Sequence, residues 1–270
     1  MSRIAATFEA LRKEKRSALI PFVTAGDPSP AQMPAIMDAL VAGGADVIEL
    51  GVPFSDPMAD GPAIQRSSER ALKHGVGLKD ILGMVATFRK RNDKTPIVLM
   101  GYANPIEHMG YAAFVSEAKK AGVDGVLVVD SPPDESAEYL KALEGSGIDP
   151  IFLLAPTSTP KRVESVAKIA SGYIYYVSLK GVSGASHIDT TDVEAAIARI
   201  RKQTKIPVGV GFGIRDAATA TRVAGFADAV VVGSRLVDEI ANAPADAIAP
   251  RLQALVREFR AALDNLARAA

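Results

Sequence analysis

Short runs of apolar, β-branched residues recur along the whole chain at regular intervals. Most of these runs are apolar throughout and do not alternate with polar residues, which is typical of parallel strands covered on both faces. They are ALIPFV (18–23), DVIEL (46–50), PIVLMGY (96–102), DGVLVV (124–129), PIFLLA (150–155), YIYYVS (173–178), PVGVGF (207–212) and DAVVVG (228–233).

Segments with helical periodicity separate these runs. Met33, Ile36, Met37 and Leu40 fall on one helical face, and the pair Gly43-Gly44 after them is a typical helix stop. The segment 252–266 shows the same spacing near the end of the chain.

Eight strands alternating with helices predict a (β/α)8 TIM barrel that forms a single domain over residues 1–270. A doubly wound open sheet is the rival fold, but PFVTAGDPSP after the first strand lacks the glycine fingerprint of that fold. We expect two additions to the simple barrel: a leading helix before the first strand, and an extra helix after the second strand. The two helices expected in that connection lie near residues 63–73 and 78–91.

The amino-acid composition argues against several classes of function. The 270 residues are 48% hydrophobic, and Lys+Arg and Asp+Glu both number 31, so the basic excess of a nucleic-acid binder is missing. Cysteine is absent, which suits a reducing compartment such as the cytoplasm. No apolar run is long enough to span a membrane, and the N-terminus lacks the apolar core of a secretory signal.

Two carboxylates mark the candidate active site. In a barrel of this class the site lies at the carboxyl ends of the strands. Glu49, inside the second apolar run, is expected at the end of the second strand, and Asp60 lies in the following loop. A solvated Glu49 at the strand end is the alternative, but burial would bring its pKa into the range useful for proton transfer. Tyr175 lies within the sixth run, where most tyrosines are core residues.

Glycines follow the last three strands, in GVSG (181–184), GFG (211–213) and VGS (232–234). The loops after strands seven and eight, with a short helix N-terminus, form the recurrent phosphate site of this fold. We expect Ser234 to cap that helix and to donate its hydroxyl to a phosphate. Ordinary strand-to-helix turns are the alternative.

Lys180 lies just after the sixth strand, where a lysine in an aldolase forms a Schiff base. A solvated loop lysine is the favoured interpretation, since a Schiff-base lysine needs a desolvated pocket. The three histidines, His74, His108 and His187, are scattered and form no metal-ligand pattern, so we expect no metal site.

Several motifs, in order along the chain, resemble the tryptophan synthase alpha chain family. They are PFVTAGDP (21–28), ELGVPFSDPMADGPAIQ (49–65), GYANPI (101–106), GVSGA (181–185), GFGI (211–214) and VVGS (231–234). Two positions depart from the family pattern: Ser131 stands where an aliphatic residue is more usual, and Ser183 where threonine is commoner.

The resemblance implies a retro-aldol cleavage of indole-3-glycerol phosphate to indole and glyceraldehyde 3-phosphate, in the last steps of tryptophan biosynthesis. It implies that Glu49 is the acid/base, that Asp60 accepts the indole N–H, and that Tyr175 assists. The residues implied for the indole pocket are Phe22, Met100, Leu127 and Phe212, and those for the phosphate are Gly184, Gly213, Gly233 and Ser234.

The resemblance also implies a partner, a beta subunit that carries pyridoxal phosphate and receives the indole in an alpha2beta2 assembly. No cofactor is expected in this chain. Lid and partner-facing loops are implied at Asp56, Pro57, Asn104, Pro132 and Ser183. Two alternatives stay open: a stand-alone lyase that releases free indole, and a binding subunit with vestigial catalysis.

Overall fold

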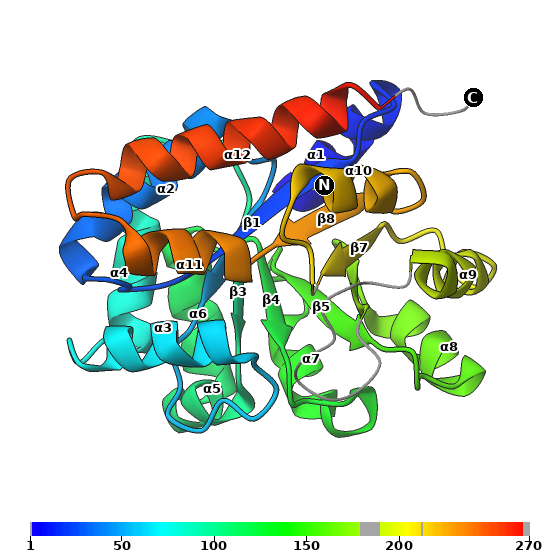
Figure 1. Ribbon diagram of the computed structural model, residues 1–270. Helices are drawn as coiled ribbons and strands as arrows, with labels where there is room; N and C mark the ends of the chain where they lie inside the picture. The colour runs from blue at the N-terminus through cyan, green and yellow to red at the C-terminus, as the bar shows by residue number, and fades with distance from the viewer. Residues whose placement is uncertain (1, 179–189, 212, 267–270) are drawn as a thin grey trace.

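Eight parallel strands close into a barrel in the computed structural model, which describes residues 2–178, 190–211 and 213–266 (Figure 1). Each strand pairs with the next along the chain, and β8 pairs with β1. The strands are β1 (Ala18–Thr24), β2 (Ile48–Gly51), β3 (Ile97–Gly101), β4 (Gly125–Val128), β5 (Asp149–Leu154), β6 (Ile174–Val177), β7 (Val208–Gly211) and β8 (Ala229–Val232). All eight predicted strands and the TIM barrel are confirmed.

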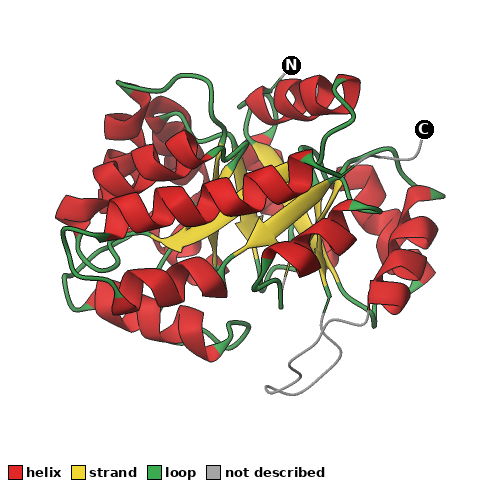
Figure 2. Ribbon diagram, turned by 45° about the horizontal axis from the view of Figure 1, so that its top comes forward, coloured by secondary structure: helices red, strands yellow, loops and turns green. Residues whose placement is uncertain are grey.

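The helices surround the outside of the barrel (Figure 2), except for α1, which packs at one end of it. They are α1 (Arg3–Lys13), α2 (Met33–Gly43), α3 (Pro62–Leu72), α4 (Leu78–Arg89), α5 (Ala103–Met109), α6 (Tyr111–Ala121), α7 (Ala137–Leu143), α8 (Pro160–Ile169), α9 (Thr190–Arg201), α10 (Ala217–Ala224), α11 (Ser234–Asn242) and α12 (Ile248–Asp264). Short 3-10 turns lie at η1 (Pro30–Gln32) and η2 (Pro133–Glu135). The predicted leading helix is α1, and α3 and α4 are the two helices expected after β2. The sequence analysis did not anticipate α5.

Helix α1 packs against the inside of the barrel at the end where the strands begin. Its buried residues Ile4, Phe8 and Leu11 belong to the same apolar cluster as the inward-facing strand residues. The Phe8 ring lies 5.9 Å from the ring of Tyr173, which directly precedes β6. This end of the barrel is therefore filled by apolar side chains.

Two aspartates, the half-buried Asp46 and the buried Asp124, tie the starts of the strands together. Asp46 accepts a hydrogen bond from the backbone N–H of Leu19 at 2.8 Å, and Asp124 accepts one from Ile97 at 2.8 Å. Asp124 also forms an ion pair with Arg89 at 2.5 Å. In barrels of this class the amino-terminal end contributes stability, which leaves the opposite end for chemistry.

Helix α2 ends at the predicted glycine pair. Gly43 is its last residue, and Gly44 caps it with φ 104°, a conformation that glycine adopts without the steric penalty of a Cβ. Within the described ranges, no helix has the length and apolar character needed to cross a bilayer.

Candidate active site

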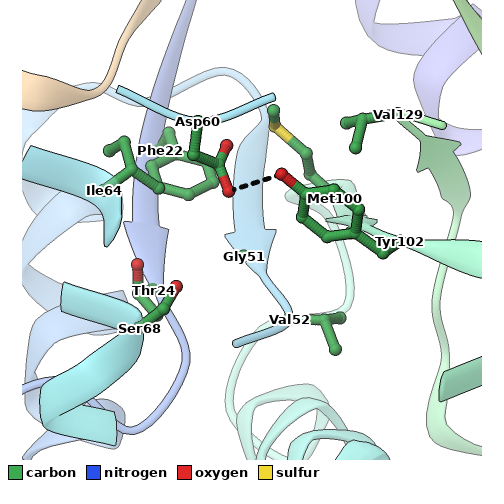
Figure 3. Close-up of a pocket in the computed structure, with 11 residues that line it drawn as sticks. Phe22, Thr24, Gly51, Val52, Asp60, Ile64, Ser68, Met100, Tyr102 and Val129 are labelled. Atoms are coloured by element: carbon green, nitrogen blue, oxygen red, sulfur yellow. Dashed lines mark hydrogen bonds between the residues drawn. The ribbon is translucent and has the colours of Figure 1, made fainter. Parts of the chain in front are cut away.

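A pocket opens at the carboxyl ends of the first four strands, as the barrel fold predicts. Most of the residues that line it are apolar or glycine, and Asp60 supplies a carboxylate (Figure 3). The lining residues are Phe22, Thr24, Gly51, Val52, Asp60, Ile64, Ser68, Met100, Gly101, Tyr102 and Val129. An apolar hollow with few polar groups is the usual composition of a small-molecule site.

Glu49 lies inside the barrel, one layer below this pocket. It is the second residue of β2 and shares the inner face of that strand with Gly51, which lines the pocket. Strand β2 runs on to Gly51, so Glu49 is within the strand and not at its end as the apolar run suggested. The side chain is 0% exposed, which excludes the alternative of a solvated carboxylate.

Among the described residues, the Glu49 carboxylate has one hydrogen-bond partner, a donor that the sequence pattern did not reveal. The hydroxyl of Tyr173 donates to Oε1, while Oε2 is buried without a partner in the described part of the chain. Burial raises the pKa of Glu49 to about 7, and the Tyr173 hydrogen bond opposes that rise. A carboxyl that gains and loses a proton near neutral pH is suited to general acid/base catalysis.

Tyr175 lies on β6 two residues beyond Tyr173, on the same inward face. Gly211 on β7 leaves room for its ring, since a Cβ at that position would lie 1.9 Å from the Tyr175 hydroxyl oxygen. Burial and the charges of Glu49 and Asp60 raise the pKa of Tyr175 well above its ordinary value. The hydroxyl therefore stays protonated in the electrostatic field of both carboxylates.

Asp60 reaches the pocket from the loop between β2 and α3, and Tyr102 holds it there. The Tyr102 hydroxyl donates to Asp60 Oδ2 at 3.1 Å and accepts the backbone N–H of Ala59 at 3.0 Å (Figure 3). The Tyr102 ring stacks on Phe54 with centroids 5.0 Å apart. Burial raises the pKa of Asp60 to about 6, against the opposing effect of the Tyr102 hydrogen bond.

The residues expected to hold an indole ring are only partly brought together. Phe22 and Met100 line the pocket, and Gly51 gives the Phe22 ring its space, since a Cβ there would lie 2.5 Å from Phe22 Cζ. Leu127 is 0% exposed and belongs to the apolar cluster inside the barrel, not to the pocket lining. Phe212 lies outside the described residues.

The expected phosphate site is described only in part. Gly213 has φ 75°, and Gly233 is the N-cap residue of α11. The expectation that Ser234 caps this helix is wrong. Gly233 occupies the capping position, so Ser234 is the first helical residue. Gly184, Ser183 and Lys180 lie outside the described residues.

The expected partner-facing residues lie in connections that follow β2, β3 and β4. Asp56 and Asn104 are exposed, and Pro57 is half-buried. Met58, between Pro57 and Ala59, is 87% exposed, and with Leu72 it is one of two exposed large apolar side chains among the described residues.

Pro132 precedes η2 in the connection after β4, and its carbonyl accepts the hydroxyl of Ser136 at 2.8 Å. The unusual Ser131 has a partner, because its hydroxyl lies 2.9 Å from that of Ser136. Among the residues that the structure describes, no group of His, Asp and Glu has the arrangement of a metal site.

Comparisons with known proteins agree on one family. The family model described as "Tryptophan synthase alpha chain" matches residues 8–264. The tryptophan synthase alpha chain of Paraburkholderia phytofirmans is 60% identical over 269 residues, with 100% of each chain covered. That of Janthinobacterium sp. is 58% identical over 265 residues, which cover 98% of this chain and 100% of the relative.

Solved structures give the same result. The crystal structure of tryptophan synthase subunit alpha from Legionella pneumophila is similar with a TM-score of 0.90 at 42% identity, covering 98% of this chain and 99% of that one. The crystal structure of tryptophan synthase from M. tuberculosis in an aminoacrylate-bound form is similar with a TM-score of 0.87 at 36% identity, covering 97% and 100%.

Proposed function

This chain belongs to the tryptophan synthase alpha chain family, and on that premise we propose that it cleaves indole-3-glycerol phosphate to indole and glyceraldehyde 3-phosphate. Membership of the family makes it an enzyme of tryptophan biosynthesis, and the proposed reaction is a carbon–carbon lyase step. The observation that carries the proposal is the fully buried Glu49 carboxyl below an apolar pocket, with its pKa raised to about 7.

The reaction needs two proton transfers that balance. Carbon 3 of the indole gains a proton, the bond from that carbon to the glycerol chain breaks, and the adjacent glycerol hydroxyl loses its proton and becomes the aldehyde. A single group that gives one proton and takes the other returns to its starting state. We assign both transfers to Glu49, because its pKa near neutrality suits it to both roles.

Protonation of the indole ring places positive charge on it, and Asp60 is the group proposed to stabilise that charge. Its carboxylate lines the pocket and would accept a hydrogen bond from the indole N–H. Such electrostatic stabilisation is strongest where water is excluded. Tyr175 is proposed to assist from its position in the field of both carboxylates.

The remaining contacts are proposed from the same premise. Phe22, Met100, Leu127 and Phe212 would hold the ring, and Gly184, Gly213, Gly233 and Ser234 would bind the phosphate. The N-terminus of α11, which begins at Ser234, supports that assignment, because backbone N–H groups there favour an anion. The chain would need no cofactor for this step.

We propose further that the indole passes to a beta subunit carrying pyridoxal phosphate, within an alpha2beta2 assembly. Asp56, Pro57, Asn104 and Pro132 would face that partner. The exposure of Asp56, Asn104 and the neighbouring Met58 supports this surface as a docking site.

An indole-release assay tests the proposal, with the purified chain alone and with the beta subunit added. We expect indole and glyceraldehyde 3-phosphate in equal amounts, formed faster when the partner is present. Equally fast release without the partner would favour the stand-alone lyase. No release under either condition would leave a binding subunit with vestigial catalysis.

A further inference from the structure

The turn after β1 has no task in the proposed reaction, although its sequence is distinctive. Phe22 is assigned to the ring and Thr24 lines the pocket, but residues 24–28, TAGDP, which comprise the last residue of β1 and the turn after it, have no role in the proton transfers. We call this segment the β1 turn. It lies against α3 and the connection that follows that helix, and Figure 3 shows Thr24 of the turn beside Ser68 of α3.

Successive residues of the β1 turn contact this neighbouring segment. Thr24 Oγ1 lies 2.5 Å from Ser67 Oγ on α3, and the two residues are 1% and 0% exposed. Gly26 has φ +85°, and a Cβ there would lie 2.6 Å from Val76 Cγ2. The β1 turn therefore matches the shape of its neighbour closely at both positions.

The strongest contact is an ion pair between Asp27 and Arg70 of α3. The two planar groups meet in a fork, with Arg70 Nε 2.6 Å from Asp27 Oδ1 and Nη2 2.7 Å from Oδ2. Asp27 is 0% exposed, and the Arg70 side chain is 27% exposed. Bidentate pairs of this kind set orientation as well as distance, which a lysine cannot reproduce.

Stability alone is a weak reason for such a pair. A buried carboxylate loses its hydration, so the attraction to arginine offsets a large desolvation penalty and adds little net stability. Three more ionisable groups act on the pair. Asp238 of α11 and Glu69 of α3 act on Arg70, and His74, whose Nε2 lies 2.8 Å from the Pro28 carbonyl oxygen, acts on Asp27. The pair is better explained by the orientation of α3 that it fixes than by the stability that it adds.

Helix α3 carries groups that hold the substrate pocket in shape. Ile64 and Ser68 line the pocket, and Gln65 Nε2 donates to the backbone carbonyl of Asp60 at 2.9 Å. Tyr102 of the β3 end holds the Asp60 carboxylate from the other side. A displacement of α3 would therefore pull the backbone of Asp60 away from the position in which Tyr102 meets its carboxylate.

We propose that Asp27 and Arg70 are positioning residues for the cleavage, and that their ion pair fixes α3 on the β1 turn so that Asp60 is held at the pocket. The inference rests on the proposed role of Asp60. It differs from a purely structural role in one respect: loss of the pair should change turnover by the folded enzyme.

The test compares Asp27→Asn with a matched control, Asp124→Asn. Asp124 is also buried, at 3% exposure, and also pairs with arginine, but at the opposite end of the barrel. We expect kcat for indole release to fall roughly 10- to 100-fold in Asp27→Asn with KM within about twofold, since small misplacements of a catalytic group have effects of this size. The control should keep wild-type kcat at a comparable fall in melting temperature.

Arg70→Lys is the second variant, and its partly exposed site makes it the safer one for folding. It keeps the charge but loses the fork, so its kcat should lie between those of wild type and Asp27→Asn. Wild-type kcat in both Asp27→Asn and Arg70→Lys would overturn the proposal.

Hydrogen exchange separates this inference from the proposed reaction. In Asp27→Asn, or in Arg70→Lys if the former does not fold, backbone amides of residues 53–60 should exchange faster than in Asp124→Asn. If wild type releases no indole, the proposed reaction fails, and this exchange measurement still decides whether the pair positions Asp60. Equal exchange in the variant and the control would contradict the positioning role.

Discussion

Tyr173 donates its hydroxyl proton to Oε1 of Glu49 inside the barrel, and both side chains are 0% exposed. Glu49 lies on β2 and Tyr173 directly precedes β6, and closure of the barrel brings these two strands together. Burial favours the neutral carboxyl, whereas the Tyr173 hydrogen bond favours the charged form. The balance of these two effects sets the pKa of about 7 on which the proposed acid/base role depends.

Replacing Tyr173 by Phe should raise the pKa of Glu49. The ring stays against Phe8, but the hydrogen bond that favours the charged carboxylate is lost. We expect a rise of about one pH unit, from the usual strength of a hydrogen bond to a charged group. A 13C NMR titration of labelled glutamate, assigned with Glu49→Gln, measures it. Tyr139→Phe is the control, because that buried hydroxyl has no partner among the described residues. An unchanged or lower midpoint in Tyr173→Phe would refute this account.

Glu49 should make the fold less stable as the pH rises. Its pKa is raised from 4.5 in the unfolded chain to about 7 in the fold, so the folded state holds the proton more tightly. Its contribution to stability is therefore fully present below pH 4.5 and is lost as the pH rises through 7. Relative to wild type, the free energy of unfolding of Glu49→Gln should rise by about 3 kcal/mol between pH 4.5 and pH 8. Chemical denaturation of both proteins at the two pH values measures this change. The same difference in unfolding free energy between the two proteins at both pH values would contradict it.

Cleavage should depend on the ionisation of Asp60. Because burial raises its pKa to about 6, kcat/KM should fall as the pH drops through 6 and the carboxylate is protonated. Tyr102→Phe removes the hydrogen bond that favours the charged form, so the midpoint of this fall should move to higher pH. In Asp60→Asn, kcat/KM should not fall in this way at acidic pH. If the fall persists in Asp60→Asn, it comes from another ionisable group.

Partner binding and substrate binding should be coupled through the loop that carries Asp56 and Asp60. A partner that contacts the exposed Asp56 would favour one arrangement of the loop, and a ligand held by Asp60 should favour the same one. A substrate analogue should then tighten the affinity for the beta subunit by roughly 5- to 150-fold, a coupling of about 1–3 kcal/mol. Calorimetry with and without the analogue measures it, and Asp56→Ala should weaken the coupling. Equal affinities in wild type would mean that the loop does not connect the two sites.

The strands were predictable because a parallel barrel buries both faces of its sheet, and strands buried on both faces are apolar throughout. Helix α5 was not, because ANPIEHM has no apolar stripe: only Ile106 in it is buried. The position of Ser234 was missed for a local reason. A serine before a helix is usually the cap, but here Gly233 takes that position.

For the site, the sequence gives the residue types but not the contacts across the barrel. Glu49 stood out because a carboxylate in an apolar run needs an explanation. Tyr173 did not, since an aromatic residue at the start of a buried strand is indistinguishable from core. Asp27 and Arg70 lie 43 residues apart, and neither position reveals the other until α3 is placed on the β1 turn.

The most direct test of the central claim, that Glu49 transfers the protons of the cleavage, is single-turnover cleavage of indole-3-glycerol phosphate by Glu49→Gln beside wild type. The account predicts that substrate affinity stays close to wild type while the cleavage rate falls roughly a hundredfold or more, because the amide keeps the shape of the side chain but cannot exchange a proton. Cleavage by Glu49→Gln at a rate near that of wild type would contradict the account.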